Sequence, residues 1–180
     1  MDTDTEAAIK SEFMREYAKK DFDRINVKEL CANVPVARTT FYAHYGNTDD
    51  VKAQVEDDLI STFEAVTRKA SGNDVAGMNF SYYLRQLAPV IKEHWSEVRA
   101  FLVTQPNLRF IEKWKGSIKG NFKRRYPDKT QVNSYGLIAE MVASAAIGGY
   151  AYWIGHPDQV SIDNVIATID RALTAMTDVL

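Results

Sequence analysis

The stretch "VARTTFYAHY", residues 36–45, carries aromatic rings and hydrogen-bonding side chains within ten positions. On a helix of about 3.6 residues per turn, Phe41 and Tyr45 lie four positions apart and share one face. Thr39 and Thr40 fall on the opposite face. The stretch therefore predicts a short helix with one face packed inward and a polar face left exposed.

The residues just before this stretch predict another short helix, which precedes it in the chain. Asn26 is placed to cap a helix "VKELCANV" at 27–34, and Pro35 ends it because proline cannot continue a helix. The apolar side chains that share its inner face are Val27, Leu30, Cys31 and Val34. Two short helices joined by a tight break, behind a longer helix, are typical of a helix-turn-helix. In that motif the second short helix reads base edges in the major groove.

Helical periodicity and helix breakers predict helices along the whole chain. The expected ranges are 5–20, 27–34, 38–45, 48–70, 78–94, 96–104, 107–125, 130–154 and 161–179. The stretch "SGNDVAG" at 71–77 is expected to be a linker because of its Gly, Ser and Asn content. No stretch shows the alternation typical of a strand, so the predicted fold class is all-α.

The composition of the chain limits the classes of protein to which it can belong. The chain has 180 residues, 46% of them hydrophobic, with a net charge of −2 and a single cysteine, Cys31. A core can form, and no disulfide framework exists within the chain. The acidic, polar start argues against a signal peptide, and we expect no membrane span. These features predict a cytoplasmic protein.

The sequence predicts neither an enzyme nor a cofactor or metal site. The three histidines, His44, His94 and His156, lie far apart, and neither HExxH nor CxxC occurs. The catalytic and nucleotide-binding patterns GxSxG, Walker loop and GxGxxG are also absent.

The segment "INVKELCANVPVARTTFYAHYGNTDDV", residues 25–51, resembles the DNA-binding segment of the TetR family of transcriptional regulators. The features that carry the resemblance are "TFY" followed by "HY", the preceding "VKELC", and "DF" closing the first helix. A later stretch, "GGYAYWIGHPDQVSIDNVI" at 148–166, resembles a subgroup of that family that includes dihydroxyacetone-kinase regulators.

The resemblance implies an N-terminal three-helix DNA-binding domain with a helix-turn-helix at 1–50. It also implies a C-terminal helical domain for ligand binding and dimerisation at 51–180. The expected function is a transcriptional regulator, a repressor, that binds a double-stranded DNA operator as a homodimer and is released by a small-molecule effector. The residues expected to face or contact DNA are Lys28, Arg38, Thr39, Thr40, Tyr42 and His44.

Three positions depart from the family pattern. Pro35 stands where the turn usually has Gly, Ala37 where a capping Ser or Asn is usual, and Thr48 where many members carry a phosphate-binding Lys. A surface helix whose polar residues merely face water would produce the same pattern. A helical ligand-binding or protein-interaction module that has lost DNA binding is therefore the alternative interpretation.

The region beyond residue 77 is rich in aromatic side chains, which are either plain core or the lining of an effector pocket. The rings expected to contact an effector are Tyr83, Phe101, Phe110, Trp114 and Tyr150. The run at 109–129, with eight basic and two acidic residues, is expected to be a solvated helix face.

The resemblance implies that 131–154 and 161–179 form a four-helix bundle between two chains. The apolar stripes expected there include Ile138, Val142, Ala145 and Gly149, and Val165, Ile166, Ile169, Ala172 and Leu173; burial within one chain is the alternative.

Overall fold

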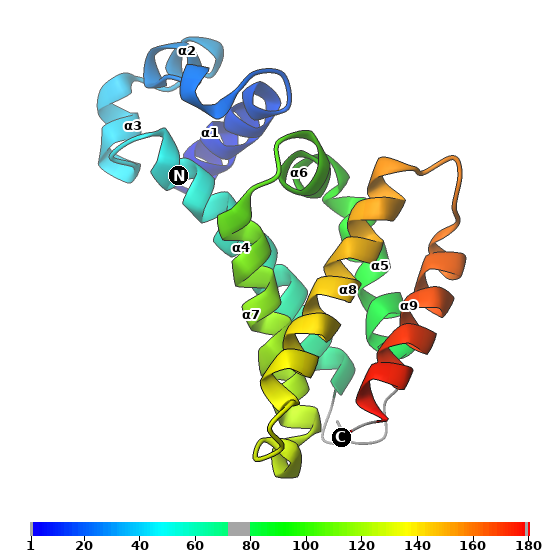
Figure 1. The fold of residues 1–180 in the computed structure, drawn as a ribbon. Coiled ribbons are helices and arrows are strands. Elements are labelled where there is room, and N and C mark those ends of the chain that lie inside the picture. Colours follow the sequence, from blue (N-terminus) through cyan, green and yellow to red (C-terminus); the bar gives the residue numbers. More distant parts are fainter. Residues whose placement is uncertain (1, 72–79, 179) are drawn as a thin grey trace.

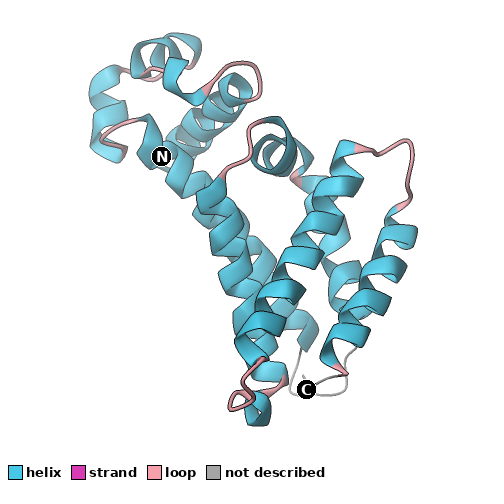
Figure 2. Cartoon of the chain, viewed as in Figure 1, coloured by secondary structure: helices cyan, strands magenta, loops and turns pink. Residues whose placement is uncertain are grey.

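The computed structural model describes residues 2–71, 80–178 and 180, and these residues form helices joined by short loops (Figure 2). Most of the expected linker at 71–77 lies outside the described residues. The α-helices are α1 (Asp2–Tyr17), α2 (Val27–Asn33), α3 (Arg38–His44), α4 (Thr48–Ser71), α5 (Phe80–Glu93), α6 (Trp95–Arg99), α7 (Leu108–Arg125), α8 (Tyr135–Gly155) and α9 (Ile162–Thr177). Short helical turns are η1 (Phe22–Arg24), the π-helical η2 (Ala100–Thr104) and η3 (Pro127–Lys129). The predicted all-α class is confirmed for the described part of the chain.

The first three helices gather at one end of the long helix α4 (Figure 1). Their common core contains Phe13 of α1, Leu30 of α2, and Phe41 and Tyr45 at α3, all 7% exposed or less. The inner face predicted for the helix at 38–45 is confirmed at Phe41 and Tyr45. Asn26 caps α2 as predicted, because its Oδ1 accepts a hydrogen bond from the Glu29 N–H at 3.0 Å.

The remaining helices form a larger group along α4. In it α8 packs between α7 and α9, while α5 packs against both α4 and α9. α4 runs without interruption from the first group into the second (Figure 1). The predicted boundary after residue 50 falls within the first turn of this helix, so a single rigid element joins the two groups.

Helix α8 is apolar on all sides, and by length and composition alone it could cross a membrane. Half of that window is buried inside the protein, where α8 contacts α7 and α9. A helix that is hydrophobic all round is typical of a buried core position. α8 is therefore a half-buried core helix.

The apolar stripes predicted for a contact between two chains are mostly used within one chain. The expected α8 and α9 residues that are buried in the single chain are Ile138, Val142, Val165, Ile166, Ile169 and Leu173. The large apolar side chains that α8 leaves exposed are Leu137, Met141 and Tyr152, at 64%, 41% and 54% exposure. Of the other expected residues, Ala145 and Gly149 are half-buried and Ala172 is exposed. On α8 the sequence gives no periodic signal of which face turns inward, because the helix is apolar all round.

We predict that Gly149 and Gly116 respond oppositely to alanine. A Cβ at Gly149 would lie 2.2 Å from Ile169 Cδ1 and 2.8 Å from its Cγ1, whereas Gly116 of α7 has open space. Gly149→Ala should lower the free energy of unfolding by about 1–3 kcal/mol through overpacking. Gly116→Ala should raise it by up to about 1 kcal/mol because alanine favours helices. Urea unfolding measures both, and equal effects would mean that α8 and α9 do not cross at Gly149.

Candidate nucleic-acid interface and ligand cavity

Helix α3 presents a polar face outward. Arg38, Thr39 and Thr40 are exposed, and the Tyr42 ring is 58% exposed while packing edge-on against Phe41 at 5.5 Å between centroids. Lys28, on the outer side of α2, is exposed as well. The structure therefore leaves five of the six residues predicted to face DNA accessible on α2 and α3.

His44 lies apart from these five residues. Only 11% of its side chain is exposed, and its Nδ1 lies 3.1 Å from Oε1 of Glu6 on α1. This contact ties the end of α3 to α1. The expectation that His44 lines the exposed surface does not match its position, because the ring turns from the polar face toward the neighbouring helix.

The geometry of the turn between α2 and α3 explains how Pro35 can stand where the TetR family usually has glycine. The Val36 N–H donates to the Val34 carbonyl at 2.7 Å, which makes a three-residue turn centred on Pro35. The common form of this turn has a negative central φ close to the value that proline imposes. Ala37 precedes α3 without a side-chain cap, as its sequence predicts. The turn therefore needs no left-handed residue, and α3 starts without a cap.

Thr48 is the first residue of α4, and the residue before it provides the cap. Asn47 Oδ1 accepts hydrogen bonds from the Asp49 and Asp50 N–H groups at 2.7 and 3.1 Å. Asn47 therefore caps α4.

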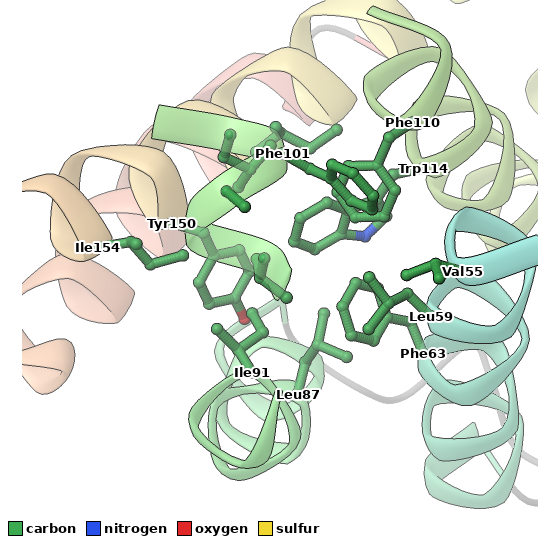
Figure 3. Packing of buried hydrophobic residues seen from close by; sticks show 14 of the residues in the cluster. Val55, Leu59, Phe63, Leu87, Ile91, Phe101, Phe110, Trp114, Tyr150 and Ile154 are labelled. Carbon is green, nitrogen blue, oxygen red and sulfur yellow. The ribbon is translucent and has the colours of Figure 1, made fainter. Parts of the chain in front are cut away.

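A cavity of about 90 Å³ lies in the larger helical group. Three of the rings predicted to contact an effector, Tyr83, Trp114 and Tyr150, line it. Phe101 and Phe110 do not: both are fully buried and pack on each other at 5.2 Å, behind Trp114. In Figure 3 the side chains of Phe63, Leu87, Trp114 and Tyr150 point toward one another around this space.

The polar groups of the cavity fall into two kinds. Tyr150 donates its hydroxyl hydrogen to the Leu84 carbonyl at 2.7 Å, and Thr67 donates to the Phe63 carbonyl at 3.0 Å. Burial raises the pKa of the Tyr150 phenol well above its usual value, so it stays protonated. The second kind comes from α7, which contributes Ser117, Asn121 and Arg125. No carboxylate among the described residues lines the cavity.

Gln105, which the sequence analysis did not single out, joins the cavity-bearing group to the first three helices. Its Nε2 donates to the carbonyls of Tyr17 and Lys20 at 2.6 and 2.7 Å, and its Oε1 accepts from the Phe22 N–H at 3.2 Å. Tyr17 returns a hydrogen bond from its hydroxyl to the Gln105 carbonyl at 3.2 Å. The π-helical turn η2 sets this position, because the Gln105 N–H bonds the Ala100 carbonyl five residues back.

Glu56 anchors the same region from α4. This carboxylate is fully buried, and it accepts hydrogen bonds from Asn107 Nδ2 and Arg109 Nε, each at 2.7 Å. Lys113 lies 3.1 Å from it. Arg109 also pairs with Asp49 in the first turn of α4, and this hydrogen bond holds the pKa of the Asp49 carboxyl below its usual value. The start of α7 is thereby fixed to the N-terminal part of α4, which directly follows α3 in the chain.

The first half of the basic run at 109–129 is paired with acidic neighbours. Arg109 and Lys113 pair with Glu56, and Lys115 and Lys119 pair with Glu140 of α8 at 2.7 and 2.8 Å. These pairs favour a helix face that holds α7 to α4 and α8. They leave little charge on this part of α7 for an anionic partner.

Elsewhere α1 and α6 are separated by an open groove of about 620 Å³, lined by residues of α1, α4 and α6. Within the described residues, no group of three or more His, Cys, Asp or Glu side chains is placed to hold a metal ion. The candidate binding features are the outer face of α2 and α3 and the cavity lined by Trp114 and Tyr150.

No protein-family model matches the chain, and no curated protein matches it. Solved structures do. A TetR-family transcriptional regulator from Syntrophomonas wolfei aligns with a TM-score of 0.79 at 10% identity, covering 98% of this chain and 96% of that chain. The TetR transcriptional regulator from Streptococcus agalactiae aligns with a TM-score of 0.72 at 16% identity, covering 96% and 94%. The dihydroxyacetone kinase operon activator DhaS aligns with a TM-score of 0.65 at 15% identity, covering 98% and 97%.

These matches extend over nearly the full length of each chain, so they include both the first three helices and the larger group. The predicted likeness to TetR regulators, including a dihydroxyacetone kinase regulator, is confirmed at the level of structure. At identities of 10–16% the shared property is the fold. The chain therefore has the all-α fold of TetR-type transcriptional regulators.

Proposed function

We propose that this protein is a DNA-binding transcriptional regulator that reads an operator with α3. The observation that carries the proposal is the division of α3 into two faces. Phe41 and Tyr45 are buried, while Arg38, Thr39, Thr40 and Tyr42 are exposed. Guanidinium and hydroxyl groups suit phosphates and base edges, and threonine methyl groups suit thymine. The near full-length likeness to TetR regulators supports the same function.

The cavity in the larger helical group is the proposed site for a small-molecule effector. Its walls are apolar and aromatic, and a few polar groups from α7 lie among them, which is the usual composition of a ligand site. We propose that the effector releases the protein from DNA, as in a repressor. A ligand shifts such an equilibrium only by its differential affinity for the two states.

Helix α7 provides a physical link between the two proposed sites. Trp114, Ser117 and Phe122 of this helix line the cavity. Just before and at its start, Gln105 holds the end of α1, and Arg109 holds the first turn of α4 directly after α3. A ligand that displaces α7 therefore acts on both helices that position α3.

The exposed row on α8 is the proposed contact between two copies of the chain. Leu137, Met141 and Tyr152 lie on it, with exposed Ser144 and Gly148 between them, at the spacing of one helix face. Small residues within an apolar row allow a second helix to approach closely. A homodimer would supply two copies of α3, which a palindromic operator needs because one recognition helix buries too little surface.

We predict that the chain sediments as a dimer at micromolar concentration and that Met141→Lys shifts it toward the monomer. The lysine would place an unpaired charge in an apolar contact. Leu108→Lys, at a 71% exposed position on α7 outside the row, is the matched control and should leave the dimer intact. Sedimentation velocity makes the measurement. A wild-type monomer that stays one chain per duplex with DNA would contradict the interface.

The DNA-binding proposal is tested by neighbouring substitutions on α3. An operator is first selected from random duplexes with the wild-type protein. Tyr42→Ala should weaken binding to that operator in a mobility-shift assay while leaving the melting temperature nearly unchanged, because the ring is exposed. Phe41→Ala should cost about 3–5 kcal/mol of stability because it empties a fully buried site. Failure to select any duplex would favour a ligand-binding module without DNA binding.

Gln105→Ala should separate DNA binding from ligand response. We expect near wild-type affinity for the operator without ligand, because the exposed face of α3 is unchanged. The change in affinity caused by a saturating cavity ligand should shrink severalfold, because the hydrogen bonds to Tyr17 and Lys20 are lost. Gln86→Ala, at an exposed position on α5, is the control. An unchanged ligand response in Gln105→Ala would mean that residues other than Gln105 couple the cavity to α3.

A further inference from the structure

We propose that the cavity binds a small neutral molecule built on one aromatic ring, with at most one hydroxyl-sized polar group. The ring would lie among the buried side chains around Trp114 and Tyr150, and the polar group would lie beside Ser117 and Asn121 of α7. The inference rests on the proposed function in treating this cavity as the effector site, and it names the chemical class of that effector.

The buried part of the cavity wall is apolar and aromatic. It contains side chains that are 6% exposed or less, which include Phe63, Leu87, Trp114, Phe122, Val142 and Tyr150. The Trp114 ring lies 4.8 Å from the Phe63 ring and 5.8 Å from the Tyr150 ring, between centroids (Figure 3). A further aromatic ring gains contacts with such rings beyond the apolar area that it buries. A cavity of about 90 Å³ limits the guest to a molecule of about one ring.

The hydroxyl groups of Tyr150 and Thr67, which line the cavity, already have partners in the chain. Tyr150 donates to the Leu84 carbonyl at 2.7 Å. Thr67 Oγ1 lies 3.0 and 3.1 Å from the carbonyl oxygens of Phe63 and Glu64. None of the described lining residues that are buried carries a charge. Because an ion buried without a partner charge is costly, this wall favours a neutral guest.

Arg125, a charged residue at the half-buried side of the cavity, is held by its own chain. Its Nε donates to the Tyr126 hydroxyl at 3.0 Å. Its guanidinium lies 5.2 Å from the centre of the Phe80 ring and 5.4 Å from the centre of the Tyr126 ring. Contacts of a cation with aromatic rings are themselves favourable. We therefore assign Arg125 no contact with the ligand.

The place for one neutral polar group is on α7. Ser117 and Asn121 are both half-buried and lie four residues apart, so they are neighbours along the cavity side of the helix. Asn121 accepts a hydrogen bond from Arg124 through Oδ1, which leaves its NH₂ group as the donor. A serine hydroxyl can donate or accept. These two uncharged groups suit a hydroxyl on the guest.

The first test compares three probes that share one ring: benzyl alcohol, benzoate and benzylamine, the last a cation at pH 7. Isothermal titration calorimetry on the wild-type protein, without DNA, gives the affinities. We expect benzyl alcohol to bind at least about tenfold more tightly than either ion, because the wall offers a buried charge no compensation. No binding of benzyl alcohol, or binding of either ion within that factor, would overturn the proposal.

A fourth probe, cyclohexylmethanol, tests the aromatic ring. It keeps the hydroxyl of benzyl alcohol but replaces the flat ring with a puckered one that has no π face. We expect it to bind at least about threefold more weakly than benzyl alcohol in the same titration. Equal or tighter binding would overturn the aromatic part of the proposal.

The second test locates the ligand. Ala146 is buried and lines the cavity, so Ala146→Leu should fill part of it and weaken benzyl alcohol binding at least about tenfold. The control is Ala167→Leu, the same change at an exposed position on α9, which should keep the wild-type affinity. Thermal melts check folding, and if Ala146→Leu does not fold, Ser117→Leu makes the same measurement at a half-buried lining position.

A folded cavity variant that binds benzyl alcohol as tightly as the wild-type protein would overturn the assignment to this cavity. Because neither test uses DNA, a failed operator selection leaves the ligand result standing, and the reverse also holds.

Discussion

The buried carboxylate of Glu56 is the constraint around which the rest of the structure is arranged. An ionised group with no exposure is costly unless charges and donors surround it, and here Asn107, Arg109 and Lys113 supply them. All three lie at or just before the start of α7, while Glu56 lies on α4. The pairing therefore specifies one position of α7 along α4. That position sets the wall of the cavity on one side and the place of Gln105 beneath α1 on the other.

The first three helices are consequently held by two different kinds of contact. Apolar packing of Phe13, Leu30 and Phe41 fixes α1, α2 and α3 to one another. Hydrogen bonds through Gln105 fix that group to the larger one, beside an open groove between α1 and α6. Apolar contacts are non-directional, whereas a few hydrogen bonds from one side chain depend on its exact placement. Tyr17 also packs on Phe101 at 5.3 Å between ring centroids, and α4 continues from one group into the other, so the position of the first group depends on both kinds of contact.

Local features of the fold could be predicted from the sequence, and features made by distant residues could not. Asn26, Asn47 and the Phe41–Tyr45 pair act within one or two turns of chain, so caps, helix ranges and the inner face of α3 follow from spacing. Glu56 and Asn107 are 51 positions apart, and Gln105 lies 88 positions from Tyr17. Periodicity carries no information about such pairs. The candidate cavity was predicted in part: Tyr83, Trp114 and Tyr150 line it, but composition could not distinguish them from the core rings Phe101 and Phe110.

Pro35 and Ala37, which differ from the TetR family pattern, affect the contacts that fix α3 in place. They do not affect which side chains α3 exposes. A seven-residue helix without a side-chain cap is too short to be stable alone, since isolated helices below about 12–15 residues are marginal in water. Its conformation must come from tertiary contacts, which are the burial of Phe41 and Tyr45 and the His44–Glu6 contact with α1. The turn at Pro35 adds a restricted φ that reduces the freedom of the unfolded chain at the point where the two short helices meet. The outward direction of Arg38, Thr39 and Tyr42 is therefore set by the core beneath them, and the absent cap leaves that direction unchanged.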